Sequence, residues 1–337
     1  PSIIEIQHSE KNNGKLLAAF SVSDSGLRGK PTSLRVMEST DGGQTWKALG
    51  EATEIIDTTI EACWNPHLYE LPEQVGDMPK GTLLLAGCSI DSAQKRKSHI
   101  TIWKSLNGGK TWKQFTVVAK GGGLGEGVWE PVMFYEESDG YLYCFYSDDT
   151  GTKYDQTVAY KRSKDGKKWE DIVHVVAASK FSYRPGMGIF TKMGNGKYFI
   201  VYEMFGDWEG CPIFYKTTDD ITSWNPSDLG KPITSTKGYT MGSAPWCAWT
   251  PVGGECGTLI VTSKYGSENP NKILVSFDYG KTFEAIDNPL PHSEAESLGY
   301  SASLFFSADG TTLFYGNNID GKDGKSNIAF AKIKIHE

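Results

Sequence analysis

A turn motif that recurs along the chain constrains its fold more than any other feature of the sequence. The motif reads Ser-x-Asp-Gly-Gly-x-Thr-Trp, and one full-length copy has Asn in place of Asp. Later copies are shortened, degenerate, or carry Phe in place of Trp. The five copies span Ser39–Trp46, Ser105–Trp112, Ser163–Trp169, Thr217–Trp224 and Ser276–Phe283. Their starts lie 54 to 66 residues apart, which predicts a repeated structural unit.

The residue types of this motif suit a tight hairpin turn. Asp or Asn accepts backbone N–H bonds within the turn, and Gly supplies positive φ. The aromatic residue is then expected to fold back onto the hairpin. We therefore interpret these carboxylates as structural rather than as metal ligands. The pattern resembles the Asp-box, or bacterial neuraminidase repeat, of sialidase-like β-propellers.

A second repeat alternates with the first. It consists of a turn glycine followed by a short apolar run, and its copies lie 53 to 67 residues apart. The six glycines are Gly14, Gly81, Gly140, Gly196, Gly257 and Gly310. Two alternating hairpins per period make four strands, and a period of this length is typical of a propeller blade. The sequence predicts an all-β fold, a six-bladed β-propeller of four-stranded antiparallel blades with Asp-box turns.

We expect one domain over residues 1–337, because the repeats continue without a linker. The last blade has no sixth Asp-box after Asn327–Ile335. Either that blade is short, or the N-terminal segment Ile3–Ile6 helps to close it. The chain opens at Pro1, which fits a removed signal peptide or a cloning boundary, and we expect a secreted protein.

Polar and aromatic residues mark one end of the expected blades. In a propeller the first strand lines the central channel and the second pairs with it antiparallel. The start of the first strand and the end of the second therefore share one face. Candidate substrate-binding residues at these positions are Trp64, Asn65, Trp129, Asp148, Arg184, Tyr202, Trp246 and Asn317.

Two carboxylates stand out on this face. Glu130 lies in the segment Val128–Pro131, and Glu203 ends the apolar run Phe199–Glu203. A carboxylate pair beside a pocket is the arrangement for glycoside hydrolysis, in which one carboxyl is protonated and the other ionised. Each glutamate could instead be a rim residue or a partner of Arg184. We interpret Asp148 as a ligand-binding residue.

The arginines argue against a sialidase, which clamps a substrate carboxylate with three of them. The chain has five, and two of these, Arg35 and Arg162, directly precede Asp-boxes on expected outer strands. Arg28, Arg96 and Arg184 remain, no Arg-Ile-Pro segment is present, and Arg184 alone sits at an expected channel position.

An ordered set of short segments is similar to family 93 of the glycoside hydrolases, the exo-α-1,5-L-arabinanases. The segments are Trp129–Pro131, Tyr146–Asp148, Arg184–Met187, Tyr202–Glu203, Ser243–Trp246, Trp249–Pro251 and Gly299–Ser301. The resemblance implies a retaining exo-enzyme that releases arabinobiose from linear arabinan. It also implies Glu130 and Glu203 as the catalytic pair, supported by Tyr300. Cys63–Pro66 and Gly186–Ile189 depart from the expected segments.

The surroundings of the two glutamates suggest their roles. Trp129 and Pro131 flank Glu130 with apolar groups, which favours the acid/base role. Glu203 would then be the nucleophile, held ionised by Arg184 or by the Tyr300 hydroxyl. Two other functions stay open: a non-catalytic propeller that binds carbohydrate or protein, and a sialidase.

Charge and cysteine pattern limit the partners. A net charge of −7 argues against nucleic acid or an anionic membrane surface and suits a neutral polysaccharide. No run of apolar residues is long enough for a membrane helix. The six cysteines form no Cys-x-x-Cys pair, and no His or carboxylate cluster has metal-ligand spacing. We expect no cofactor, no catalytic metal and a monomer.

Overall fold

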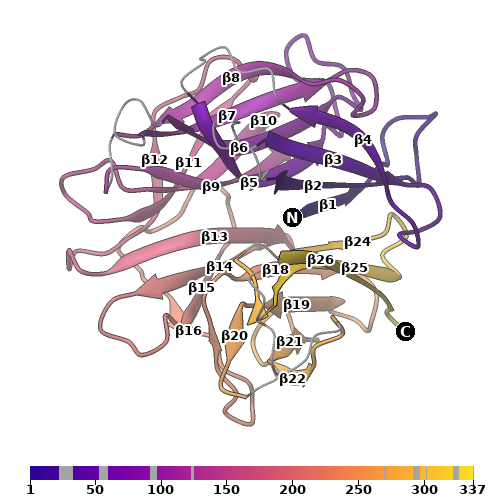
Figure 1. Cartoon of the computed structure of the whole chain (residues 1–337). Coiled ribbons are helices and arrows are strands. Elements are labelled where there is room, and N and C mark those ends of the chain that lie inside the picture. Colours follow the sequence, from indigo (N-terminus) through magenta and orange to yellow (C-terminus); the bar gives the residue numbers. More distant parts are fainter. Residues whose placement is uncertain are drawn as a thin grey trace. The chain divides into compact units, whose positions relative to one another are not determined.

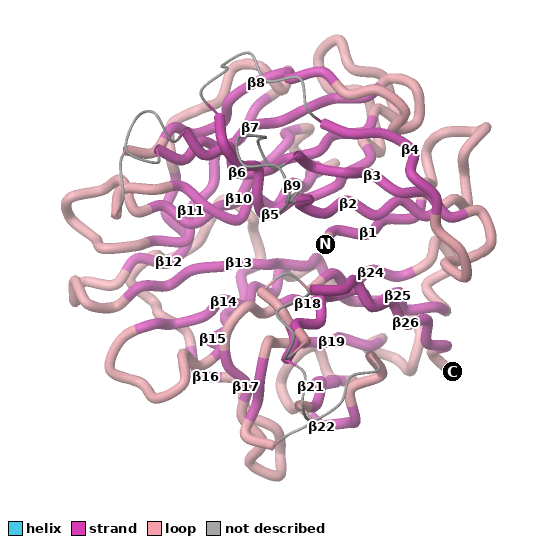
Figure 2. Tube along the Cα trace, viewed as in Figure 1, coloured by secondary structure: helices cyan, strands magenta, loops and turns pink. Residues whose placement is uncertain are grey.

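A computed structural model describes residues 1–22, 33–52, 60–91, 97–122, 125–268, 271–290, 297–300, 302–321 and 326–336. Strands and loops account for all of these residues, as Figure 2 shows. Within the described ranges no helix could cross a membrane. The chain forms two compact units, one of residues 1–152 and 159–173, the other of residues 153–158 and 174–337.

Three four-stranded antiparallel sheets come first along the chain (Figure 1). The first contains β1 (Ser2–Glu5), β2 (Leu16–Val22), β3 (Ser33–Ser39) and β4 (Lys47–Ala52). The second contains β5 (Ile60–Glu70), β6 (Leu83–Asp91), β7 (Lys97–Ser105) and β8 (Lys113–Lys120). The third contains β9 (Val128–Glu136), β10 (Tyr141–Asp148), β11 (Thr157–Ser163) and β12 (Val173–Ala177). In each sheet the strands follow sequence order.

Three further four-stranded sheets follow in the second unit. The fourth contains β13 (Arg184–Lys192), β14 (Tyr198–Phe205), β15 (Ile213–Thr218) and β16 (Lys231–Pro232). The fifth contains β18 (Trp246–Thr250), β19 (Thr258–Thr262), β21 (Lys272–Ser276) and β22 (Glu284–Asp287). The sixth contains β23 (Ser297–Leu298), β24 (Ser303–Phe306), β25 (Thr312–Asp320) and β26 (Ser326–Lys334). A two-stranded ribbon joins β17 (Met241–Gly242) to β20 (Tyr265–Gly266).

These six sheets are the blades of a six-bladed β-propeller, so the predicted fold class is confirmed. The six repeat glycines all have positive φ, and each lies in the turn that leads into the second strand of its blade. Their equivalence confirms the repeat from which the fold was predicted. At Gly81 a Cβ would also come within 2.7 Å of the His8 carbonyl oxygen, so neighbouring backbone leaves no room for a side chain.

The sixth blade is short. β23 and β24 pair with different stretches of the same edge of one strand, β25. Together they therefore take the place of a single strand in the blade. β26 pairs with the other edge of β25. The N-terminal strand β1 pairs with β2 as the first strand of the first blade. Of the two expectations for the last blade, the short blade is therefore the one found in the described residues.

The Asp-box turns have the predicted hydrogen bonds. In the first, Asp41 Oδ1 accepts from the backbone N–H groups of Gln44 and Thr45, each at 3.0 Å. The Trp46 indole N–H donates to the Gly43 carbonyl at 3.2 Å. The Thr45 hydroxyl also donates to Asp41. This bond, followed by the backbone bonds to the same carboxylate, holds the pKa of Asp41 well below its usual range.

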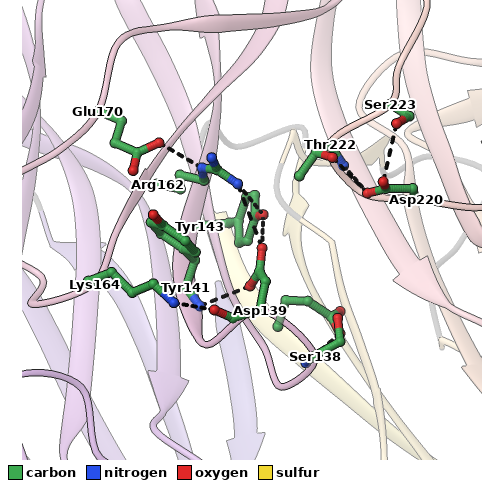
Figure 3. A network of polar contacts seen from close by, with 11 residues as sticks. Ser138, Asp139, Tyr141, Tyr143, Arg162, Lys164, Glu170, Asp220, Thr222 and Ser223 are labelled. Atoms are coloured by element: carbon green, nitrogen blue, oxygen red, sulfur yellow. Dashed lines mark hydrogen bonds and ion pairs between the residues drawn. The ribbon is translucent and has the colours of Figure 1, made fainter.

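The fourth copy, Thr217–Trp224, is shifted by one residue from the predicted register. The turn is organised by Asp220, not by Asp219: Asp220 Oδ1 accepts from the backbone N–H of Thr222 at 2.8 Å, and its Oδ2 accepts from Ser223 (Figure 3). Asp219 instead forms an ion pair with Lys197. Two adjacent aspartates without the usual glycines made the register ambiguous in the sequence.

The outer strands carry the arginines that the sequence assigned to them. Arg35 lies on β3 and Arg162 on β11, the third strands of their blades. Arg162 donates to Glu170 at 2.8 Å and lies over the Tyr141 ring, in the network that Figure 3 shows. Arg28 and Arg96 lie outside the described residues. Arg35 and Arg162 thus belong to the outer part of their blades, as predicted.

Candidate active site

A kink recurs in the first strand of several blades. In β5, β9 and β13, two residues lie opposite one residue of the second strand, which makes a β-bulge. A non-glycine residue with positive φ sits in each bulge: Asn65 at 51°, Glu130 at 53° and Met187 at 53°. The equivalent place before β18 holds Ser243 and Ala244, at 57° and 46°.

Such backbone is costly, by about 1–3 kcal/mol per residue. Asn65, Glu130 and Ala244 each precede Pro, and this position favours extended backbone, so the left-handed conformation is disfavoured twice over. Bulges and strained residues concentrate at functional sites, where they redirect a side chain. The sequence placed three of these four positions at the channel. On β13 the sequence analysis selected Arg184, whereas the residue with positive φ is Met187.

Glu130 lies in the first unit between apolar neighbours. Its side chain is half-buried, and its Oε2 atom has almost no contact with solvent. The Cys88 thiol is close by: burial raises the pKa of Cys88 well above its usual range, and the negative charge of Glu130 raises it further. One oxygen of the Glu130 carboxyl is thus shielded from solvent beside a buried thiol.

Asp149, which the sequence analysis did not select, positions the neighbouring tryptophan. The Trp129 indole N–H donates to Asp149 Oδ2 at 3.1 Å, and the backbone N–H of Asp149 donates to the Gly127 carbonyl at 2.8 Å. Asp148 instead organises its own turn, because its Oδ1 accepts from the backbone N–H and the hydroxyl of Thr150. Of these two adjacent aspartates, Asp149 is the one that orients the aromatic ring beside Glu130.

Glu203 lies in the second unit, on β14, and is held by the strained segment before β18. Its Oε2 accepts a hydrogen bond from the Ser243 hydroxyl and another from the Ala244 backbone N–H, each at 2.9 Å. The Cys211 thiol also lies against it, and burial followed by the Glu203 charge raises the pKa of Cys211 to about 12. The two hydrogen bonds hold one carboxylate oxygen of Glu203 in a fixed position, as an oriented nucleophile requires.

Tyr300 belongs to the same neighbourhood. Its ring is exposed, and the Lys264 ammonium lies 3.2 Å from the ring centroid. The backbone N–H of Lys264 donates to the Ser243 carbonyl at 2.9 Å. Burial raises the pKa of Tyr265, and the charges of Cys211, Glu203 and Tyr300 add to that effect. Lys264 thus links the Tyr300 ring to Ser243, and Ser243 in turn donates to Glu203.

An aromatic ledge, defined as Phe181, Tyr183, Phe205 and Trp208, continues this surface. Phe205 is two residues beyond Glu203 on β14 and so points to the same face of the strand. The Tyr183 and Trp208 ring centroids are 4.5 Å apart. Phe181 and Phe205 are 56% and 60% exposed, although both are large apolar side chains. The sequence places Tyr183 and Trp208 near the predicted mouth of the channel, but Phe181 and Phe205 were not selected for the site.

The remaining predicted binding residues divide into exposed and structural positions. Trp64 is 36% exposed and remains available to a ligand. Arg184 forms an ion pair with Asp155 at 2.5 Å, while the described hydrogen bonds to Glu203 come from Ser243 and Ala244. The Trp246 indole N–H donates to the Leu304 carbonyl at 3.1 Å, which ties β18 to β24.

Tyr202 is a packing residue and Asn317 is fully buried, which corrects their prediction as substrate contacts at an open face. Both have no exposed surface, and the Tyr202 hydroxyl donates to the Leu229 carbonyl. Successive residues of a strand point to opposite faces. Tyr202 therefore faces the core because Glu203 faces the site, a consequence of strand parity that the sequence analysis overlooked.

No cluster suited to a metal ion, with three or more His, Cys, Asp or Glu side chains, occurs in the described ranges. All six cysteines are free thiols, and four of them are buried. Glu130 belongs to the first unit, and Glu203 and Tyr300 belong to the second.

Comparison with known proteins confirms the resemblance seen in the sequence. The profile of the BNR/Asp-box repeat matches residues 37–48. A search of curated proteins finds no match. Among solved structures, the chain is similar to an α-L-arabinanase of Penicillium chrysogenum, solved with arabinobiose. The identity is 29%, the TM-score is 0.82, and the match covers 95% of this chain and 90% of the other.

It is also similar to a GH93 α-L-arabinofuranosidase of Fusarium graminearum, solved with arabinobiose. The identity is 26%, the TM-score is 0.84, and the match covers 99% of this chain and 92% of the other. A sialidase of Trypanosoma rangeli is 13% identical, with a TM-score of 0.62 over 99% of this chain and 54% of the other, which shows a shared fold alone. The more similar neighbours are glycoside hydrolases.

Proposed function

We propose that this chain is a retaining exo-α-1,5-L-arabinanase that releases arabinobiose from linear arabinan. The observation that carries the proposal is the Glu203 carboxylate, which accepts two hydrogen bonds from a strained segment. Backbone strain is maintained where a side chain must be oriented. The similarity to two arabinan-degrading enzymes over nearly the whole chain supports arabinan as the substrate.

In the proposed mechanism the two glutamates have separate roles. Glu203 attacks the anomeric carbon and forms a covalent glycosyl-enzyme, while Glu130 donates a proton to the departing glycosidic oxygen. Glu130 then removes a proton from water, which attacks the same carbon and releases Glu203. The burial of one Glu130 oxygen and the hydrogen bonds to Glu203 support this order.

The proposal covers the whole chain as one catalytic domain, because the blades continue from the first unit into the second without a linker. We also propose that the enzyme is a monomer. It places the enzyme outside the cell, since a polysaccharide does not cross a membrane.

The experiment is incubation of the protein with linear arabinan, followed by analysis of the early products. We expect arabinobiose as the first product, and no release of sialic acid from sialyllactose. Binding of arabinan without hydrolysis would favour the non-catalytic carbohydrate-binding propeller. Release of sialic acid would favour the sialidase.

A further inference from the structure

A cavity lies in the second unit, away from Glu203. Its volume is about 540 Å³, within the range of small-molecule sites. It adjoins the turn that leads into β14, whereas Glu203 lies near the far end of that strand. The lining residues are Asn195, Lys197, Tyr215, Lys216, Thr217, Asp228, Gly230, Lys231, Tyr279, Gly280 and Lys281.

The lining has more positive than negative charge, although the whole chain carries a net charge of −7. Four lysines face one carboxylate, that of Asp228. Lys197 is neutralised by an ion pair with Asp219 at 2.6 Å. The cavity therefore concentrates positive charge on an acidic protein, which attracts anions to that place.

Lys216 is a fixed part of the wall. It is 7% exposed, and its ammonium donates to the carbonyl oxygens of Val175 at 2.7 Å, Asn225 at 2.7 Å and Asp228 at 2.9 Å. These three bonds use all its donors, so Lys216 contributes charge to the cavity without being able to bind a ligand directly.

Lys231 and Lys281 are the two lysines available to a ligand. Both are exposed, and neither ammonium has an ion pair or hydrogen bond to any residue within the described ranges. The Lys231 ammonium lies 5.2 Å from the centroid of the Tyr215 ring. Tyr279 stacks on Trp249, with centroids 6.4 Å apart. The Tyr215 ring is 8% exposed, so it supports Lys231 from below, and the half-buried Tyr279 is the ring that a ligand can reach.

We propose that this cavity binds a sugar acid, with Lys231 and Lys281 recognising the carboxylate and Tyr279 contacting the sugar ring. Ammonium groups form charge-assisted hydrogen bonds with carboxylates. Aromatic side chains present an apolar face together with a polar hydroxyl, which suits a sugar. The site is separate from Glu203, and the inference does not rest on the proposed hydrolysis.

The test is isothermal titration of the intact protein at low salt with trigalacturonate. The matched titrations use neutral maltotriose, which is not an arabinan fragment, and inorganic sulfate. We expect binding of trigalacturonate, and a loss of affinity of about tenfold or more in the double variant Lys231→Gln, Lys281→Gln. The control double variant Lys110→Gln, Lys113→Gln removes the same charge from the first unit and should bind as the wild type does.

Three results would overturn the inference. They are no binding of trigalacturonate, equal affinity in the two double variants, and binding of sulfate or maltotriose as tight as that of trigalacturonate. Thermal unfolding of both variants verifies their folding. Hydrolysis of arabinan by both variants should match the wild type, so a failure here is separate from a failure of the proposed function.

Discussion

The Oε2 atom of Glu203 lies 2.9 Å from the backbone nitrogen of Ala244, a residue held at a φ of 46°. An alanine rarely adopts this conformation, and here it precedes Pro245. The backbone thus accepts an unfavourable geometry in which its N–H points at a carboxylate. Ser243, also at positive φ, adds its hydroxyl to the same oxygen.

Loss of the Ser243 hydroxyl should slow catalysis without unfolding the protein. In Ser243→Ala, Glu203 keeps the Ala244 N–H but loses one of its two donors. We expect kcat on arabinan to fall by about tenfold to a hundredfold, since a hydrogen bond to a charged group contributes about 1.5–3 kcal/mol. Steady-state kinetics measure this effect.

The matched control is Ser263→Ala, whose hydroxyl donates to the Tyr265 carbonyl at 2.8 Å in the same blade. It should retain nearly normal kcat. If both variants lose activity equally, the effect is structural and the role of Ser243 in holding Glu203 is wrong.

The two glutamates should differ when each is replaced by alanine. Glu130→Ala removes proton donation, which contributes about 10²–10⁴-fold, so its defect should shrink on aryl glycosides with good leaving groups. Azide should restore turnover on those substrates. Glu203→Ala removes the nucleophile and should impair all substrates alike.

Kinetics on arabinan and on a series of aryl arabinosides distinguish these patterns. A leaving-group-dependent defect in Glu203→Ala would exchange the two roles. Nearly normal activity of either variant on arabinan would remove that residue from the catalytic pair.

The aromatic ledge should bind the polymer. Phe205→Ala removes an exposed ring beside Glu203, and we expect KM for arabinan to rise about two- to tenfold with little change in kcat. The control Phe277→Ala removes another exposed ring, one that lies in an Asp-box turn. An unchanged KM in Phe205→Ala, or an equal rise in the control, would show that the ledge has no part in binding.

His67 should make the first unit sensitive to acid. Its Nδ1 accepts from the backbone N–H of Met133 at 3.3 Å, and burial lowers its pKa to about 4, from 6.5. Between these values the unfolded chain binds more protons than the folded one, so stability falls as pH decreases from 6.5 to 4. The full loss is about 3 kcal/mol.

Denaturant unfolding at pH 7, 5.5 and 4.5 checks this prediction. His67→Gln should flatten the decline, whereas the exposed control His336→Gln should leave it unchanged. An identical pH dependence in His67→Gln and the wild type would mean that another group causes the acid sensitivity.

The sequence predicted the blades because their signals are local. Gly14 and its five counterparts need positive φ, and the Asp-box turns depend on residues within a few positions. The fourth turn was misplaced by one residue because Asp219 and Asp220 are equally good acceptors in the sequence. Only the hydrogen bonds of the folded turn distinguish them.

The site was less predictable because its contacts join distant segments. Nothing local shows that Ala244 donates to Glu203, 41 residues earlier, or that Trp129 donates to Asp149 rather than to a neighbour. Strand parity, in contrast, was available: Tyr202 and Glu203 are consecutive on β14 and could not both face the substrate.

Hydrolysis of linear arabinan in the presence of methanol, followed by NMR of the early products, tests the central proposal most directly. A retaining exo-enzyme with Glu203 as nucleophile should yield arabinobiose, together with a methyl arabinobioside of the same α configuration as the substrate. No cleavage, a mixture of internal fragments, or a product of inverted configuration would contradict the account.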